Sequence, residues 1–170
     1  GTIPEGESLT VTDAFTVAIA GNVPDQHIIS FTLESTDGNE DWQSGIEITA
    51  HAPDLQTGEI LVEDPERNNN NGLLDPGEIV NVLVEIKNMG HTVSESTITS
   101  LSCANGFITI NNTQDELGQI QPEESTNAVF TMVCSEATPV GTVLNFDCEA
   151  QAGAYSCATT RRVFGSPWNI

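Results

Sequence analysis

Apolar and polar residues alternate with a period of two along most of the chain, and no window holds a sustained helical period. In one such run, Val80, Val82 and Val84 fall on one face, whereas Asn81 and Glu85 fall on the other. This pattern is typical of a half-buried β-strand. Runs of this kind, each predicted as a strand, occur at residues 11–20, 27–35, 45–50, 79–87, 95–103, 107–111, 127–134, 142–150 and 154–163.

Turn signals separate several of these runs. We expect their glycines to adopt the positive φ that tight turns require, at Asp37-Gly38, Asn88-Met89-Gly90, Asn105-Gly106 and Ala152-Gly153. Many short strands at this spacing predict an all-β fold, an immunoglobulin-like antiparallel β-sandwich.

An internal repeat adds to this interpretation. A shift of 115 residues aligns residues 15–36 with residues 130–151 without a gap, and apolar positions such as Val17 and Met132 stay in register. The identical pairs are Phe15/Phe130, Thr16/Thr131, Pro24/Pro139, Phe31/Phe146 and Glu34/Glu149. We interpret the alignment as a duplication.

The repeat predicts how the chain is divided. Its length matches one immunoglobulin-like sandwich, so residues 55–170 are predicted to be a complete sandwich. Residues 1–53 then form the C-terminal half of a preceding repeat, with about three strands, and residues 54–78 hold the first strand and a loop at the junction. A sheet face without its partner sheet is adhesive. We therefore expect residues 1–53 to pack on the complete domain or to form a homodimer with another copy.

Composition excludes some partners. The chain has 25 acidic and 4 basic residues and a formal net charge of -21, which argues against binding to nucleic acid or to anionic membranes. No apolar run is long enough to span a bilayer, and no signal segment opens the sequence, so no membrane insertion is expected. Four cysteines in an acidic chain rich in Thr and Asn indicate an extracellular or cell-surface location.

Residues 63–78 have the composition of a calcium loop, because calcium binds six to eight hard oxygens on a sharply turning segment. In the EF-hand spacing, Gly72 takes the sixth position and Glu78 the twelfth. The first position falls on Arg67, which cannot ligate, so Asp64 or Glu66 must replace it. The predicted ligands are Asp64, Glu66, Asn69, Asn71, Leu73 through its carbonyl, Asp75 and Glu78. The alternative is a polar linker in which Arg67 pairs with a carboxylate.

One stretch of the chain resembles a known family. It begins at Glu63, includes the Leu74-Asp75-Pro76-Gly77-Glu78 motif, and continues through the alternating run that ends in Asn88-Met89-Gly90. It resembles the immunoglobulin-like repeats of large secreted or surface bacterial proteins, as found beside gingipain-type cysteine peptidase domains and in adhesion repeats. The resemblance covers roughly residues 60–165. It implies a spacer or adhesion module and no catalytic role. Arg67 departs from the Gly or Asn common in that loop.

The four cysteines allow three connectivities. Cys148 and Cys157 are symmetric about Ala152-Gly153, so a two-residue turn there would place them opposite each other across a hairpin. Cys103 then has Cys134 as its natural partner. Two disulfides, Cys103–Cys134 and Cys148–Cys157, are one interpretation, and buried free thiols are the other. A zinc site at the cysteines is not expected, because no Cys-x-x-Cys pair exists.

No catalytic constellation stands out. His27, His51 and His91 are isolated in the sequence, and no phosphate-binding Gly-rich loop or nucleophile elbow is present. We therefore predict a non-catalytic, calcium-stabilised extracellular β-sandwich, a spacer or adhesion module of a larger protein that contacts neighbouring domains of the same chain and a surface protein or glycan. Two alternatives stay open: an accessory domain of a secreted gingipain-type peptidase, and a carbohydrate-binding module.

Overall fold

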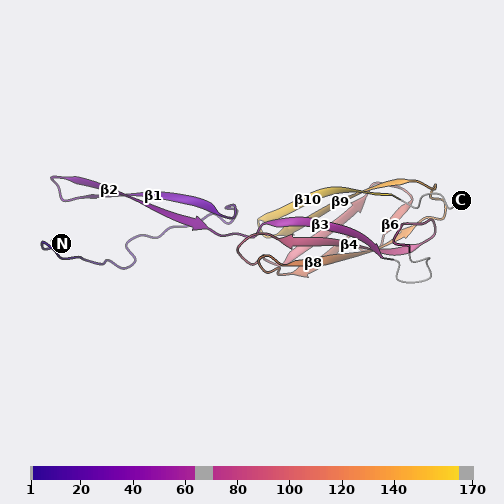
Figure 1. Ribbon diagram of the computed structural model, residues 1–170, viewed down its shortest axis with the longest axis horizontal. Coiled ribbons are helices and arrows are strands. Elements are labelled where there is room, and N and C mark those ends of the chain that lie inside the picture. Colours follow the sequence, from indigo (N-terminus) through magenta and orange to yellow (C-terminus); the bar gives the residue numbers. More distant parts are fainter. Residues whose placement is uncertain (1, 64–70, 165–170) are drawn as a thin grey trace.

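The computed structural model describes residues 2–63 and 71–164, and its main body is a sandwich of two four-stranded antiparallel sheets (Figure 1). One sheet has the strand order β10 (Tyr155–Phe164), β9 (Val143–Ala152), β5 (Thr97–Cys103) and β7 (Gln114–Gly118). The other has the order β3 (Leu55–Glu63), β4 (Ile79–Asn88), β8 (Ser125–Cys134) and β6 (Ile108–Ile110). The predicted all-β, immunoglobulin-like sandwich is confirmed.

The core forms where the inward faces of the two sheets meet. Burial alternates residue by residue along β4, β8 and β9, as a period of two requires. Phe130 and Phe146, one from each sheet, are fully buried and lie in a core cluster with Val82 and Leu101. The alternation seen in the sequence therefore places the apolar side chains between the sheets.

A separate two-stranded sheet precedes the sandwich. Strands β1 (His27–Thr36) and β2 (Asp41–Ala50) pair along their whole length and project from one end of the sandwich (Figure 1). The prediction of about three strands in residues 1–53 is wrong in one respect: residues 11–20 form no strand, and they include a turn at which Asp13 has a φ of 55°. Their repeat counterpart, β8, is a strand because it pairs with β4 and β6, and residues 1–53 supply no equivalent of those two strands.

The hairpin reproduces the register of β9 and β10. Ile29 pairs with Ile48, and adding 115 to both numbers gives the pair Leu144 and Val163. The same shift relates nine of the ten pairs of β1 and β2, from Ile28 and Thr49 to Thr36 and Asp41, to pairs of β9 and β10.

The turn before each hairpin is repeated too. The His27 amide donates to the Pro24 carbonyl at 3.3 Å, and the Thr142 amide donates to the Pro139 carbonyl at 3.1 Å. Gln26 (φ 59°) and Gly141 (φ 78°), which are 115 residues apart, are both left-handed. The backbone conformation of this turn is therefore repeated at the 115-residue spacing found in the sequence.

In the first copy of the repeat, residues 2–50, the side chains that correspond to core residues of the sandwich are exposed. Phe15 is 75% exposed, whereas its counterpart Phe130 is fully buried. Val17 and Ile19 are about half exposed, although Met132 and Cys134 lie in the core. Residues 2–50 therefore carry an apolar face that the described residues do not cover.

Two of the four predicted turn glycines behave as expected. Gly38 and Gly153 have positive φ, whereas Gly90 and Gly106 do not. Gly90 is needed for space instead, because a Cβ there would overlap the backbone of Ala52 and Asp54. The Asn-x-Gly motif thus lets the linker between hairpin and sandwich pass directly beside Gly90, just after the end of β4.

The Asn88 side chain, completely buried, joins this linker to the loops at the same end of the sandwich. Its Nδ2 donates to the carbonyls of Thr92 (2.9 Å) and Ile120 (3.0 Å). Its Oδ1 accepts from the amides of Asp54 and Gly90, both at 3.1 Å. One amide group therefore satisfies four backbone groups from three segments.

Replacement of Asn88 is expected to be strongly destabilising. Asn88→Ala leaves the four backbone groups unpaired, which we expect to lower the free energy of unfolding by roughly 3 to 5 kcal/mol. Asn88→Asp keeps the shape but points a carboxylate oxygen at two carbonyls. Its deficit should shrink as the pH falls, because a protonated carboxyl regains one donor. Urea denaturation measures both, with Asn145→Ala on the exposed face of β9 as the control. A loss in Asn88→Ala no larger than in the control would contradict this role.

Candidate functional site

The described part of the predicted calcium loop brings three oxygen-bearing side chains together. Asn71 Nδ2 donates to Asp75 Oδ2 at 2.9 Å, and the Asp75 amide donates to Glu78 Oε2 at 3.1 Å. Gly72 and Gly77 have φ of 70° and 85°, which allow the chain to turn sharply between them. Asn71, Asp75 and Glu78 thus lie close together, and their assignment as calcium ligands stays a prediction.

The core and β8 hold this segment in place. Leu74 is 2% exposed and belongs to the core cluster. The Gly77 amide donates to the Cys134 carbonyl at 3.0 Å, and the Cys134 amide donates to the Glu78 carbonyl at 2.9 Å. Leu73 is partly exposed, and its amide donates to Asn71 Oδ1 at 2.7 Å. The loop is therefore anchored on both sides of Asp75.

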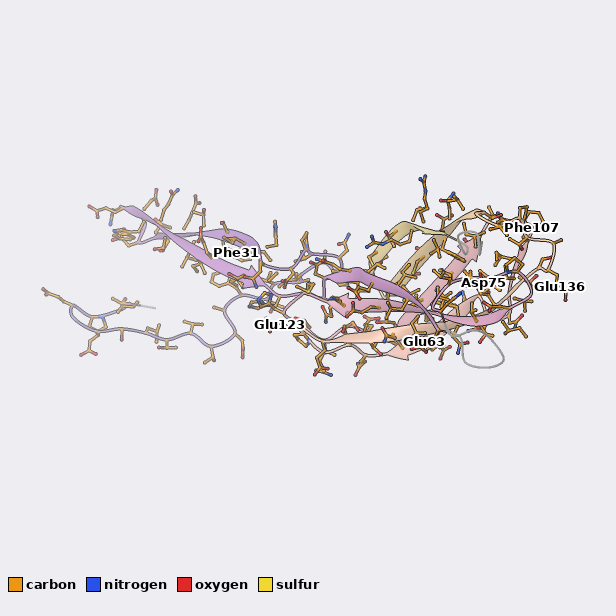
Figure 2. The ribbon with its side chains drawn as sticks, turned by 45° about the vertical axis from the view of Figure 1, so that its right-hand side comes forward. Phe31, Glu63, Asp75, Phe107, Glu123 and Glu136 are labelled. Atoms are coloured by element: carbon orange, nitrogen blue, oxygen red, sulfur yellow. The ribbon has the colours of Figure 1, made fainter. Side chains whose placement is uncertain are left out.

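Three predicted ligands, Asp64, Glu66 and Asn69, lie outside the described residues, as does Arg67. The position of the loop differs from the prediction. It connects β3 to β4 at the end of the sandwich opposite the hairpin, where Figure 2 shows Asp75 with Glu136 and far from Phe31 on β1. The expectation that it lies at the junction with the half-repeat is wrong, because β3 carries the chain along the whole sandwich before the loop begins.

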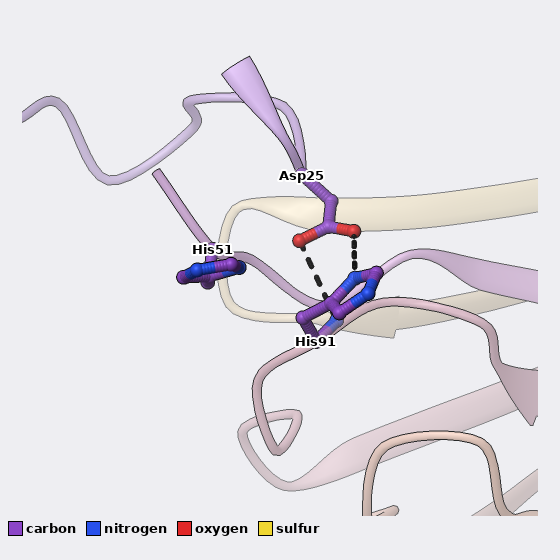
Figure 3. Close-up of side chains that lie close together, drawn as sticks. All are labelled: Asp25, His51 and His91. Carbon is purple, nitrogen blue, oxygen red and sulfur yellow. Dashed lines mark hydrogen bonds and ion pairs between the residues drawn. The ribbon is translucent and has the colours of Figure 1, made fainter. Parts of the chain in front are cut away.

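A different cluster occupies the junction. Asp25 precedes β1, His51 follows β2, and His91 lies in the loop between β4 and β5 (Figure 3). The Asp25 carboxylate contacts the His91 ring, with Oδ2 and Nδ1 2.6 Å apart, and Oδ1 accepts from the Ala52 amide at 2.8 Å. The rings of His51 and His91 have centroids 5.6 Å apart. The hairpin and the sandwich therefore meet at these three side chains.

The Asp25 carboxylate is well shielded, with 12% of its side chain exposed. Burial by itself would raise the pKa of Asp25, but the hydrogen bonds from the Ala52 amide and from His91, together with the charge of His91, outweigh it and lower the pKa. Asp25 is thus ionised at neutral pH.

A further hydrogen bond joins the hairpin region to the sandwich at this junction: the Tyr155 hydroxyl donates to the Val23 carbonyl at 2.9 Å.

Sequence reasoning missed this cluster because the three residues are far apart along the chain. A signal existed in the hairpin pattern: His27 pairs with Ala50, so residues 26 and 51 must be neighbours. Indeed Gln26 Nε2 lies 3.0 Å from His51 Nδ1. No pattern in the sequence points to His91 as the third member.

The four cysteines are free thiols in the structure. Cys148 pairs with Thr159 and Cys157 with Ala150, so the expectation that the two cysteines lie directly opposite is wrong. The two-residue turn is Gly153-Ala154 and not Ala152-Gly153, which moves the cross-strand register by two residues. Cys148 and Cys157 are diagonal neighbours, a geometry whose typical separation exceeds that of a disulfide. Cys103 and Cys134 come from opposite sheets.

Burial suppresses the reactivity of two of these thiols, Cys103 and Cys148. Burial, with a smaller contribution from Cys157, raises the pKa of Cys148 to about 11. Burial also raises the pKa of Cys103. Both shifts oppose formation of the thiolate that a nucleophilic cysteine requires.

Alkylation tests this assignment. From an ordinary thiol pKa of 9.0 to about 11, the thiolate fraction of Cys148 falls about 100-fold at pH 8, and its labelling by iodoacetamide should slow by at least that factor. Peptide mass spectrometry at several pH values measures the rate, with urea-unfolded protein as the reference. Labelling of native Cys148 as fast as in the unfolded chain would contradict the prediction.

No helix long and apolar enough to cross a membrane occurs in the part of the chain that the structure describes. No protein-family model and no curated protein matches the sequence. Among solved structures, the chain is similar to the ASH / PapD-like domain of human CEP192 (PapD-like domain 7), with 12% sequence identity and a TM-score of 0.38. The match covers 58% of this chain and 78% of that domain. The assignment of the fold rests on the strand order and pairing described above.

Proposed function

We propose that the protein is a non-catalytic, extracellular β-sandwich module that acts as a spacer or adhesion unit within a larger secreted or surface protein. The observation that carries this proposal is that the β1–β2 hairpin repeats the register of β9–β10 and joins the sandwich at one end. Repetition of one module along an axis is how spacer regions of such proteins gain length. The charge of -21 suits an exposed, solvated surface.

In this proposal, residues 2–50 are the last part of a preceding sandwich. Their apolar side chains, Phe15 and Val17 among them, are exposed because the strands that would cover them are not among the described residues. The matching positions Phe130 and Met132 show how much burial a complete sandwich provides. When the missing strands are not supplied, a second copy of the chain covers the same face and gives a homodimer.

The dimer is testable in solution. We expect the 170-residue chain to show concentration-dependent dimerisation in size-exclusion chromatography with light scattering, and Phe15→Ser to weaken it by at least about tenfold because it removes a large apolar contact. Leu61→Ser is the matched control, since Leu61 is 52% exposed on β3 of the sandwich. A wild-type chain that stays monomeric at every concentration, or equal weakening by the two substitutions, would refute this use of the face.

We also propose a structural calcium ion in the loop of residues 63–78. The donor chemistry fits: Asn71, Asp75 and Glu78 offer hard oxygens on a glycine-flanked turn anchored by Leu74. Asp64, Glu66, Asn69 and the carbonyl of Leu73 would complete the set. Calcium there would fix the end of the sandwich from which β10 leaves at Phe164 and would offset part of the carboxylate repulsion.

Thermal unfolding tests the calcium site. Addition of Ca²⁺ alone to protein stripped of divalent ions should raise Tm, with about 2.7 kcal/mol of stabilisation at a hundredfold excess over Kd. Asp75→Asn should abolish most of the rise because it removes a charged oxygen ligand. Glu149→Gln on the exposed face of β9 is the control and should respond as the wild type does. An unchanged Tm for the wild type, or a full response in Asp75→Asn, would rule out the site.

A further inference from the structure

The cluster at the junction has the composition and the spacing of a metal site with nitrogen ligands. One carboxylate oxygen of Asp25 and one ring nitrogen each of His51 and His91 all lie within 4.8 Å of one another. Ligand atoms on a tetrahedral zinc ion are about 3.4 Å apart, given bonds of about 2.1 Å. To bind an ion, the 2.6 Å contact between Asp25 Oδ2 and His91 Nδ1 has to open and the His51 ring has to approach. Both rings have room to move, because His51 is exposed and the His91 side chain is 53% exposed.

The surroundings of the cluster prepare these groups for binding. Asp25 Oδ1 accepts from the amides of Ala52 at 2.8 Å and His91 at 3.4 Å, which orients the carboxylate toward the rings. Gln26 contacts Nδ1 of His51 and holds that ring in place. Gln26 has a left-handed backbone (φ 59°) where the second copy has Gly141, so the first copy keeps a less favourable residue at the position beside the cluster.

The donor set also selects the ion. Two imidazoles and one carboxylate favour zinc and its borderline neighbours, whereas calcium and magnesium prefer oxygen ligands. The cluster therefore differs in chemistry from the loop of residues 71–78. The cluster lies where the β1–β2 hairpin meets the sandwich (Figure 1), whereas Asp75 of the loop lies at the far end (Figure 2). The net charge of -21 favours any cation near the surface but does not distinguish zinc from calcium.

We propose that Asp25, His51 and His91 form a binding site for Zn²⁺ or a closely related divalent transition-metal ion, which links the hairpin to the sandwich. His51 and Asp25 belong to the two ends of the hairpin, and His91 belongs to the β4–β5 loop of the sandwich. An ion bound to all three closes a bridge between the two bodies. The remaining coordination position is open to water or to a ligand from another molecule.

Cobalt substitution tests the site directly. Tag-free protein is titrated with Co²⁺ in saturating Ca²⁺, so that the loop of residues 63–78 does not compete, and Zn²⁺ is then added to displace the cobalt. We expect one Co²⁺ per chain, visible d–d absorption of a four- or five-coordinate ion with nitrogen and oxygen ligands, and displacement by Zn²⁺. Absence of saturable binding, or a thiolate-to-cobalt charge-transfer band that places the ion on the cysteines, would overturn the proposal.

Histidine variants provide the matched comparison. His51→Ala should weaken Co²⁺ and Zn²⁺ binding by at least about tenfold through loss of a ligand, and it should leave folding unchanged because His51 is exposed. His91→Ala should do the same. His27→Ala removes the third histidine, exposed at the start of β1 and outside the cluster, and should bind as the wild type does. Equal affinities in His51→Ala and wild type would refute the site, whatever the outcome of the calcium experiment.

Discussion

The end of the sandwich that receives the hairpin depends on the hydrogen bonds of the buried Asn88 amide. A buried polar group is tolerated only when its partners are present, and here all four partners are backbone groups from the linker, the β4–β5 loop and Ile120. Satisfying them fixes the paths of three segments at once. The linker can then pass over Gly90, which has no side chain to block it. The linker holds His51 and the β4–β5 loop holds His91, so the Asn88 amide helps to set the positions of both side chains.

The two ends of the sandwich thus carry different chemistry. At the loop end, Asn71, Asp75 and Glu78 gather oxygens on a segment anchored by Leu74. At the hairpin end, Asp25 is held by backbone amides and faces two imidazoles. Between them lies an apolar core with no described ionisable side chain other than thiols among its buried members. The apolar core thus separates the two clusters.

Much of the fold follows from periodicity, and the failures have physical reasons. The alternation in residues 79–87, 127–134 and 142–150 predicts strands that the structure contains, because half-buried strands require that pattern. Residues 11–20 have the same pattern but no pairing partner among the residues that the structure describes, so local sequence alone does not make them a strand. Strand β7, Gln114–Gly118, has little alternation and exists because β5 is beside it. The Asn71, Asp75 and Glu78 cluster could be predicted because its residues are close in sequence. The Asp25, His51 and His91 cluster could not, because it depends on how two bodies are joined.

The junction has a consequence for how such modules are combined. Asp25 and His51 belong to the first copy and His91 to the second, and in the second copy the position equivalent to Asp25 is Val140. The residues that meet at the junction therefore come from two successive copies of the repeat. A module moved to another place in the chain would meet a neighbour without the matching side chains. In a chain of such repeats, as proposed above, the side chains at each junction would restrict which module can follow another.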